Sequence, residues 1–349
     1  MFPQFYNALS WWAVEAHYRL RIHKSMKWNR LPFAVISTLA IAAATAAKAQ
    51  QWPTRPITVV SPFVSGTTDD LVARIVLDPV GQRLGQPFVL ENRPGGDGTV
   101  GVAFVVKANP DGQTLLLTSS ATSVAVILHK SLPYDVLGDL EPVAMFGGEP
   151  TLLVAAPNKG YASVAALVAT AKAKPGELKF ASVGIGSASH LAGERFRLVA
   201  GLNVQHVPYA GPAQALAELT AGRIDFYFIP VVPALPLITE GRVVPLAVST
   251  PHRLQSLTGL PTLDEAGYPI GRYLEWCGLS APANTPHDIV DKLNAAIATT
   301  LGLPAVHRQL LRVGFEPAPM NPKQFATFFS DDVTAMIKLA KDAHIEPLE

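Results

Sequence analysis

The chain has 349 residues, and 28 Lys and Arg against 27 Asp and Glu give it a formal net charge of +1. Such a balance offers no broad basic surface for phosphate backbones, which excludes nucleic acid as the expected partner. Hydrophobic residues make up 49% of the chain, enough for a sizeable core, and the single cysteine, Cys277, excludes an internal disulfide.

The N-terminal region predicts a secretory leader. Leu31–Ala47 is a long apolar run that follows Lys27 and Arg30 and ends in an A-x-A pattern at Ala49. These features are typical of a signal peptide over residues 1–49, cleaved after Ala49. Met26 fits as the true start, which makes residues 1–25 an N-terminal extension.

The alternative interpretation of this run is a membrane anchor. Its length is short for a spanning helix. Gln50 stands where a lipoprotein would carry its lipid-bearing Cys. We therefore expect an unanchored protein in a Gram-negative periplasm. Residues 1–49 hold six Lys and Arg and one Glu, so the residues after the leader hold 22 basic and 26 acidic side chains and have a net charge of −4.

Beyond the leader, short apolar runs alternate with helical periodicity. Val164, Leu167, Val168 and Ala171 follow the helical spacing i, i+3, i+4, i+7. The alternation predicts the α/β class with parallel sheets. Strands are expected at Ile57–Val60, Phe88–Glu91, Leu115–Thr118, Leu152–Ala155, Lys179–Ala181, Val204–Val207, Ile224–Phe228, Val244–Val248 and Gly278–Ala281.

The order of these elements predicts two lobes with a ligand cleft between them. We expect residues 50–151 and 276–349 to form lobe 1, and residues 152–275 to form lobe 2. In each lobe an apolar strand runs into a loop of Gly, Ser and Thr and then into a helix, once after Ile57 and once after Phe180. Loops of this kind direct backbone N–H groups and a helix dipole toward an anion.

Motifs typical of enzymes, cofactor sites and metal sites are weak in this sequence. Gly96–Gly101 fits G-x-G-x-x-G, but the next expected strand ends in Thr118 and not in the ribose-binding acid of a dinucleotide site. The histidines show no metal-ligand spacing. His190 follows Ser187 and Ser189, which leaves a hydrolase as an alternative, although adjacency in sequence does not build a Ser–His geometry. We expect a binding protein and not an enzyme, with no catalytic residue, no metal and no cofactor.

Seven segments in register resemble one known family. They are Pro62–Arg74 (PFVSGTTDDLVAR), Glu91–Gly101 (ENRPGGDGTVG), Ala108–Leu117, Leu132–Asp135, Ser182–Glu194 (SVGIGSASHLAGE), His206–Gly211 and Glu275–Pro286 (EWCGLSAPANTP). The sequence is similar there to the substrate-binding proteins of tripartite tricarboxylate transporters, also called Bug or TctC-like extracytoplasmic solute receptors. The resemblance implies a two-lobed periplasmic binding protein of the Venus-flytrap type, which captures a small carboxylate and delivers it to a two-component membrane permease.

The expected site lies at the carboxyl ends of the strands, where ligands bind in open α/β sheets. Its loops contain hydroxyls and glycines but no Lys or Arg, so neutral donors would hold the carboxylate. Asp70 is expected to brace its loop more than to contact the ligand. The candidate ligand-binding residues are Phe63, Gly66, Thr67, Thr68, Asp70, Ser120, Thr122, Gly186, Ser187, Ser189, His190, Tyr209 and Ile229.

Departures from the family pattern bear on the ligand. Ile229 stands where many members carry Asp, and Ala210 replaces a frequent Lys. We therefore expect a carboxylate without an amino group, whose apolar body lies toward Phe63, Tyr209 and Ile229. An alternative is a receptor that binds its ligand between the lobes in the same way, but docks to the periplasmic domain of a sensor and transports nothing.

Overall fold

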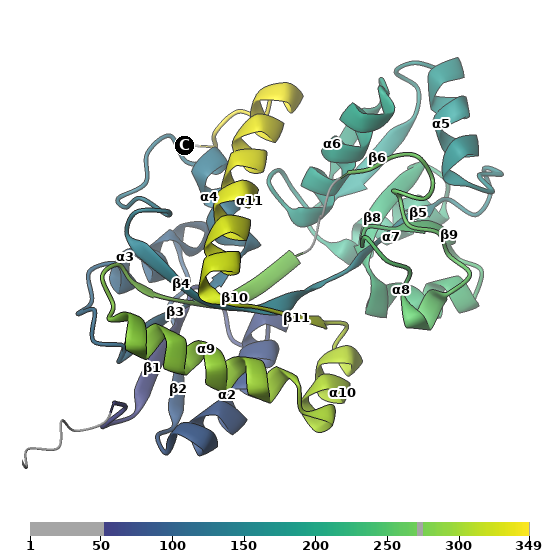
Figure 1. Ribbon diagram of the computed structural model, residues 1–349. Helices are drawn as coiled ribbons and strands as arrows, with labels where there is room; N and C mark the ends of the chain where they lie inside the picture. Colours follow the sequence, from purple (N-terminus) through teal and green to yellow (C-terminus); the bar gives the residue numbers. More distant parts are fainter. Residues whose placement is uncertain (1–51, 271–274, 349) are drawn as a thin grey trace, which may run out of the picture. The chain divides into compact units, whose positions relative to one another are not determined.

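The computed structural model describes residues 52–270 and 275–348. The predicted leader and its cleavage site lie outside these residues. From Trp52 onward the chain forms one compact unit that contains two β-sheets, each covered by helices (Figure 1). The two-lobed α/β class predicted from the sequence is confirmed.

The first sheet has six strands in the order β11-β4-β10-β3-β1-β2. Its strands and the helices connected to them come from both ends of the described chain. They are β1 Ile57–Ser61, α2 Thr68–Leu84, β2 Phe88–Asn92, a 3₁₀ turn at Gly96–Gly98, α3 Thr99–Val105, β3 Thr114–Ser119, α4 Ser120–Leu128, β4 Leu140–Glu149, β10 Glu275–Pro282, α9 His287–Leu301, α10 Pro304–Arg312, β11 Glu316–Met320 and α11 Pro322–Ala343.

The second sheet has five strands in the order β7-β6-β8-β5-β9. All of its strands come from the middle of the chain. They and their helices are β5 Thr151–Ala155, α5 Val164–Ala173, β6 Lys179–Ser182, α6 Ala188–Ala200, β7 Gln205–Pro208, α7 Pro212–Thr220, β8 Phe226–Pro230, α8 Val231–Thr239, β9 Val244–Val248 and a 3₁₀ turn at Gln255–Leu257.

The expectation of parallel sheets was wrong, because both sheets are mixed. Pairs such as β1–β3 and β6–β7 are parallel. In contrast, β10 runs antiparallel to β3 and β4, and β5 runs antiparallel to β8 and β9. The cause is the path between the lobes: β4 carries the chain out of the first sheet at Glu149 and β10 brings it back at Glu275, so the two strands run in opposite directions.

Each sheet has an apolar core on both faces. On the first sheet, α2 and α9 cover one face, where Val76 and Leu293 are buried, and α11 covers the other, where Phe325 and Phe329 pack around Trp276. The predicted helical residues Val164, Leu167, Val168 and Ala171 are all buried in the second lobe. One core is shared between the lobes, since Leu128 of α4 and Met336 and Leu339 of α11 belong to the cluster around β6 and β8.

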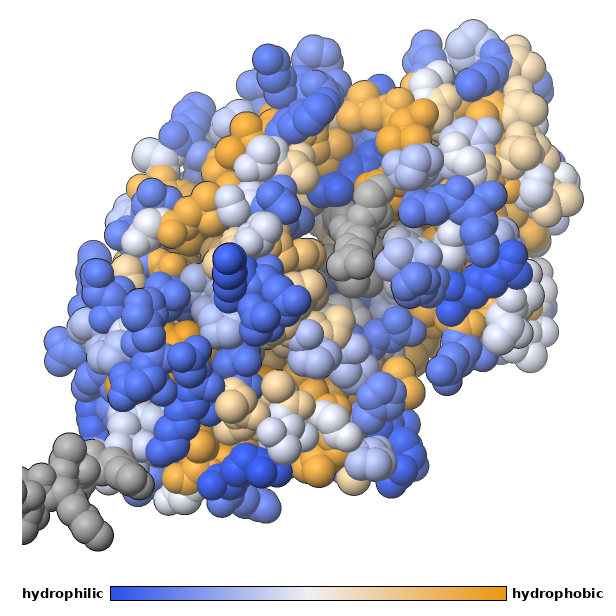
Figure 2. All heavy atoms as spheres, in the orientation of Figure 1, coloured by the Kyte–Doolittle hydropathy of each residue, from blue (hydrophilic) through white to orange (hydrophobic). Residues whose placement is uncertain are grey.

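In the part of the chain that the structure describes, no single helix is both long and apolar enough to cross a membrane, although the bent pair α9–α10 is by length and composition. Figure 2 shows hydrophilic side chains spread over much of the visible face, interrupted by smaller apolar areas.

Candidate functional site

The first candidate loop, between β1 and α2, is braced by Asp70. Its Oδ2 accepts hydrogen bonds from the Gly66 amide (3.2 Å) and from Arg74 Nε (3.2 Å), and its Oδ1 accepts from Asn92 Nδ2 (3.0 Å). Burial alone would raise the pKa of Asp70, but the hydrogen bonds from Asn92, Gly66 and Arg74 outweigh it and lower the pKa. Asp70 is 1% exposed, so the charged carboxylate fixes the loop.

Some of the other groups in this loop make hydrogen bonds within the protein, and one hydroxyl remains without a partner among the described residues. Thr67 is the N-cap of α2, and its hydroxyl accepts from the Asp70 amide at 3.3 Å. The Phe63 carbonyl accepts from Asn92 Nδ2 at 3.1 Å. Thr68 is half-buried, and its hydroxyl makes no hydrogen bond to any described residue. Thr68 is thus the hydroxyl that this loop has available for a ligand.

The loop after β3 opens α4 with a capping box. The Ser119 hydroxyl accepts from the Ala121 amide at 3.2 Å, and the Thr122 hydroxyl accepts from the Ser119 amide at 3.5 Å. Thr122 is 4% exposed. Ser120 is half-buried and its hydroxyl has no partner among residues 52–270 and 275–348, so it offers a donor at the first turn of the helix.

The loop after β6, Val183–Ser187, is the counterpart in the second lobe. Ser187 is the N-cap of α6, and its hydroxyl donates to the Gly184 carbonyl at 2.6 Å. The Ser189 hydroxyl accepts from the Val183 amide at 3.2 Å and also bonds to the Tyr227 hydroxyl. Much of the polar capacity that the sequence assigns to a ligand is therefore used inside the loop.

His190, Tyr209 and Ile229 occupy different surroundings. His190 is 5% exposed, and its Nδ1 accepts from the Gly186 amide at 3.1 Å. Tyr209 is half-buried against the core that contains Ile229. Ile229 is 3% exposed and pairs with Leu152 in the middle of the second sheet. Of these three, Tyr209 presents the most accessible side chain.

Three acids near these loops were not identified from the sequence. Glu275 and Glu149 lie directly opposite each other on β10 and β4, at the two points where the chain passes between the lobes. Asp69, in the first turn of α2, hydrogen-bonds to the buried thiol of Cys277. Tyr227 of the second lobe is close enough for the charge of Glu275 to affect its titration.

The three carboxyls hold their protons unusually strongly. Burial raises the pKa of Asp69 to about 6. Burial, reinforced by the charge of Asp69, raises that of Glu149 to about 7. Burial, reinforced by Glu149 and Asp69, raises that of Glu275 to about 8. A protonated carboxyl is a hydrogen-bond donor. With a pKa of about 8, Glu275 stays mostly protonated at neutral pH and can donate to an anion, whereas Asp69, with a pKa of about 6, is mostly ionised there.

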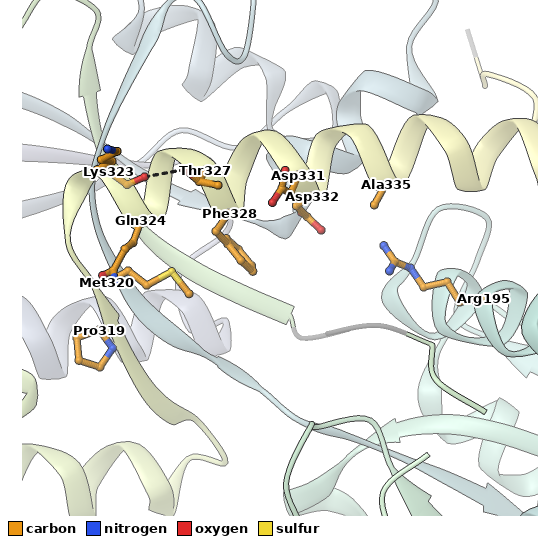
Figure 3. A pocket seen from close by; sticks show the side chains of 10 residues that line it. All are labelled: Arg195, Pro319, Met320, Lys323, Gln324, Thr327, Phe328, Asp331, Asp332 and Ala335. Atoms are coloured by element: carbon orange, nitrogen blue, oxygen red, sulfur yellow. Dashed lines mark hydrogen bonds between the residues drawn. The ribbon is translucent and has the colours of Figure 1, made fainter. Parts of the chain in front are cut away.

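A separate cavity of about 720 Å³ lies along α11 (Figure 3). Arg195 of α6 projects toward it, on the opposite side from Asp332 and Ala335 of α11. Asp332 accepts from Trp276 Nε1 at 2.9 Å. None of the predicted ligand-binding residues lines it. The lining consists of Arg195, Pro319, Met320, Lys323, Gln324, Thr327, Phe328, Asp331, Asp332 and Ala335.

Metal and nucleophile chemistry find little support in the described residues. No group of three or more His, Cys, Asp or Glu among them could hold a metal ion. Ser182 Oγ lies 2.6 Å from His206 Nε2. Ser182 is fully buried, however, and no carboxylate of residues 52–270 or 275–348 bonds to His206. The Ser182 hydroxyl is therefore not exposed at the surface.

Comparison with known proteins decides the family. The sequence matches the family model of the tripartite tricarboxylate transporter family receptor, TctC, over residues 72–344. The chain belongs to this family. BugT of Bordetella pertussis is 36% identical over 302 residues, which cover 85% of this chain and 91% of BugT.

Three solved structures of similar sequence share the fold. The R. palustris protein Rpa4515, solved with adipate, is 34% identical with a TM-score of 0.70, over 85% of this chain and all of that one. MatC from Rhodopseudomonas palustris, with bound malate, is 30% identical with a TM-score of 0.64, over 82% of this chain and 99% of MatC. The periplasmic binding protein BugD is 31% identical with a TM-score of 0.66, over 85% of this chain and all of BugD. This TctC-family chain is therefore a solute-binding receptor by family and fold.

Proposed function

We propose that this receptor captures a small carboxylate between its two lobes in the periplasm and delivers it to a two-component membrane permease, without turnover. The observation that carries the proposal is the position of three hydroxyl-bearing loops, which follow the carboxyl ends of β1, β3 and β6. Adipate and malate in the two structural relatives support a carboxylate as the ligand class.

The ligand contacts follow from the hydroxyls that the fold leaves available. Thr68 and Ser120 on the first lobe have no hydrogen-bond partner in the described chain. The Ile185 amide on the second lobe is likewise without a described partner. Hydrogen bonds to a charged group contribute about 1.5–3 kcal/mol each, so several such bonds with water excluded reach micromolar affinity. Gly66, Ser187, Ser189, Phe63 and Tyr209 complete the proposed lining.

The ligand is expected to lack an amino group. The sequence offers no acid at Ile229, and of the acids that the structure adds near the loops, Glu275 has its pKa raised to about 8 and stays mostly protonated at neutral pH. A neutral carboxyl gives an ammonium group no counter-charge, whereas it donates a hydrogen bond to a carboxylate. Carboxylates with an apolar body therefore match the loops better than amino acids of similar size.

Isothermal titration tests this function. Adipate and malate are titrated into the receptor beside aspartate and glutamate, and the two simple carboxylates should bind more tightly. Thr68→Ala and Ser120→Ala should each weaken binding by about 10- to 150-fold, the equivalent of one hydrogen bond to a charged group. Thr299→Ala, an exposed hydroxyl on α9, is the matched control and should leave affinity unchanged.

Two results would contradict the proposal. Wild-type affinity in both loop variants would show that these loops are not the site. Conversion of a bound acid or ester into product, followed by chromatography, would make the protein an enzyme.

A further inference from the structure

Two stacked imidazole rings lie beneath the second-lobe loop Val183–Ser187. The ring centroids of His190 on α6 and His206 on β7 are 4.2 Å apart, with an interplanar angle of 28°. His206 stacks in turn on Phe180 of β6, at 4.9 Å. The stack therefore joins the loop to the core of the second lobe.

Each histidine holds one glycine of the loop. The Gly186 amide donates to His190 Nδ1 at 3.1 Å. The Gly184 amide donates to Ser182 Oγ at 3.1 Å, and that hydroxyl bonds to His206 Nε2 at 2.6 Å. Both glycines have positive φ, 122° for Gly184 and 78° for Gly186. The histidines thus hold the loop at its two left-handed residues, where the backbone direction changes.

The hydrogen bond from Gly186 requires a neutral His190 ring. A nitrogen that accepts a hydrogen bond carries no proton, so His190 Nδ1 is unprotonated. Burial lowers the pKa of His190 to about 4, and the neighbouring His206 and Arg197 act in the same direction. Burial also lowers the pKa of His206 to about 4. Arg197 is paired with Glu194 on the same helix.

We propose that His190 and His206 are positioning residues that fix the backbone of Val183–Ser187 for ligand binding, without touching the ligand. The proposal rests on the proposed function for its effect on affinity, and it gives His190 a different role from the direct contact expected from the sequence. Because His190 engages the Gly186 amide, that amide is not a ligand donor.

The proposal can be tested with substitutions that each reproduce only one of the two ring nitrogens of a histidine. The Asn amide oxygen reaches the position of Nδ1, and the Gln amide reaches that of Nε2. At position 190 the required atom is Nδ1, so His190→Asn should keep adipate affinity within about threefold while His190→Gln should lose tenfold or more. At position 206 the required atom is Nε2, so His206→Gln should keep affinity and His206→Asn should lose it.

Hydrogen exchange of the ligand-free protein supplies a second, independent readout. Peptides covering residues 182–190 should exchange faster in His190→Gln and His206→Asn, and at the wild-type rate in the two matched variants. In this crossed pattern, Asn is tolerated only at position 190 and Gln only at position 206. A role in general packing predicts instead that both substitutions at a position disturb the protein alike. Urea unfolding of all four variants measures that packing cost.

The outcomes distinguish the two proposals. If wild type binds no carboxylate but the exchange pattern is crossed, the proposed function fails and the positioning role stands. Equal loss in both variants at each position, or wild-type exchange in all four, would overturn the positioning role.

Discussion

The cross-strand pair of Glu149 and Glu275 lowers the stability of the fold when both side chains are charged. Like charges directly opposite each other on neighbouring strands are destabilising. Burial and the two neighbouring acids raise the pKa of Glu275 to about 8. The folded protein therefore binds a proton there that the unfolded chain, with an ordinary glutamate, releases at lower pH.

The raised pKa of Glu275 predicts that the stability of the protein depends on pH. A carboxyl with a raised folded-state pKa favours folding below its unfolded pKa and loses that contribution as pH rises through about 8. Glu275→Gln, which cannot ionise, should raise the free energy of unfolding at pH 8–9 by about 1–3 kcal/mol and change it little at pH 5. Urea unfolding at both pH values measures the difference. The exposed Glu177→Gln is the control and should show no such pH dependence.

The roles of individual residues could be predicted only in part from the sequence. The bracing role of Asp70 was anticipated and agrees with its four hydrogen-bonding partners, Ser65, Gly66, Arg74 and Asn92. The three acids were not found, because Glu149 and Glu275 are 126 positions apart and become neighbours only through the β4–β10 register. Which hydroxyls serve as caps was also unpredictable, since a cap and a ligand donor use the same residue types.

At the scale of elements, the sequence revealed the strands with strong apolar runs and missed two others. β11, Glu316–Met320, contains two prolines and lies at the edge of the first sheet, the position where proline is tolerated. β4 contains Gly147 and Gly148, which weaken the strand pattern. α2 contains Pro79 in its interior and continues to Leu84.

The glycine of β10 shows how tightly the β4–β10 pair packs. A Cβ on Gly278 would lie 2.5 Å from the Ala144 carbonyl oxygen and 3.0 Å from Phe325 Cζ. Because backbone on the neighbouring strand cannot move without breaking the pair, Gly278→Ala should destabilise the fold by about 1–3 kcal/mol. Gly259→Ala is the matched control, since no heavy atom lies within 4 Å of its added Cβ. Urea midpoints that fall equally in both variants would contradict this packing argument.

At the scale of the whole molecule, α11 belongs to both lobes. Phe325 and Phe329 near its start pack in the core of the first lobe, whereas Met336 and Leu339 pack in a core of the second. The shared helix predicts that the lobes unfold as one cooperative unit, because melting either core removes support from the other.

Tryptophan fluorescence tests this coupling. The tryptophans after the leader, Trp52 and Trp276, both pack against cores of the first sheet. Leu339→Ala opens a cavity in the second-lobe core and should cost about 2–5 kcal/mol. If the lobes are coupled, the fluorescence midpoint in urea shifts together with the circular dichroism midpoint. Ile337→Ala, with a side chain 51% exposed, is the control. A fluorescence midpoint that stays in place while dichroism shifts would show independent lobes.

Cys277 carries a consequence for how the chain reaches its native state. It is the only thiol in the sequence, it is fully buried, and it is hydrogen-bonded to Asp69. Burial, with the charge of Asp69, holds its pKa well above the ordinary value, so little thiolate forms. Maturation therefore includes no oxidation or shuffling of sulfur bridges, and the yield of native protein should be the same in a reducing and in an oxidising compartment.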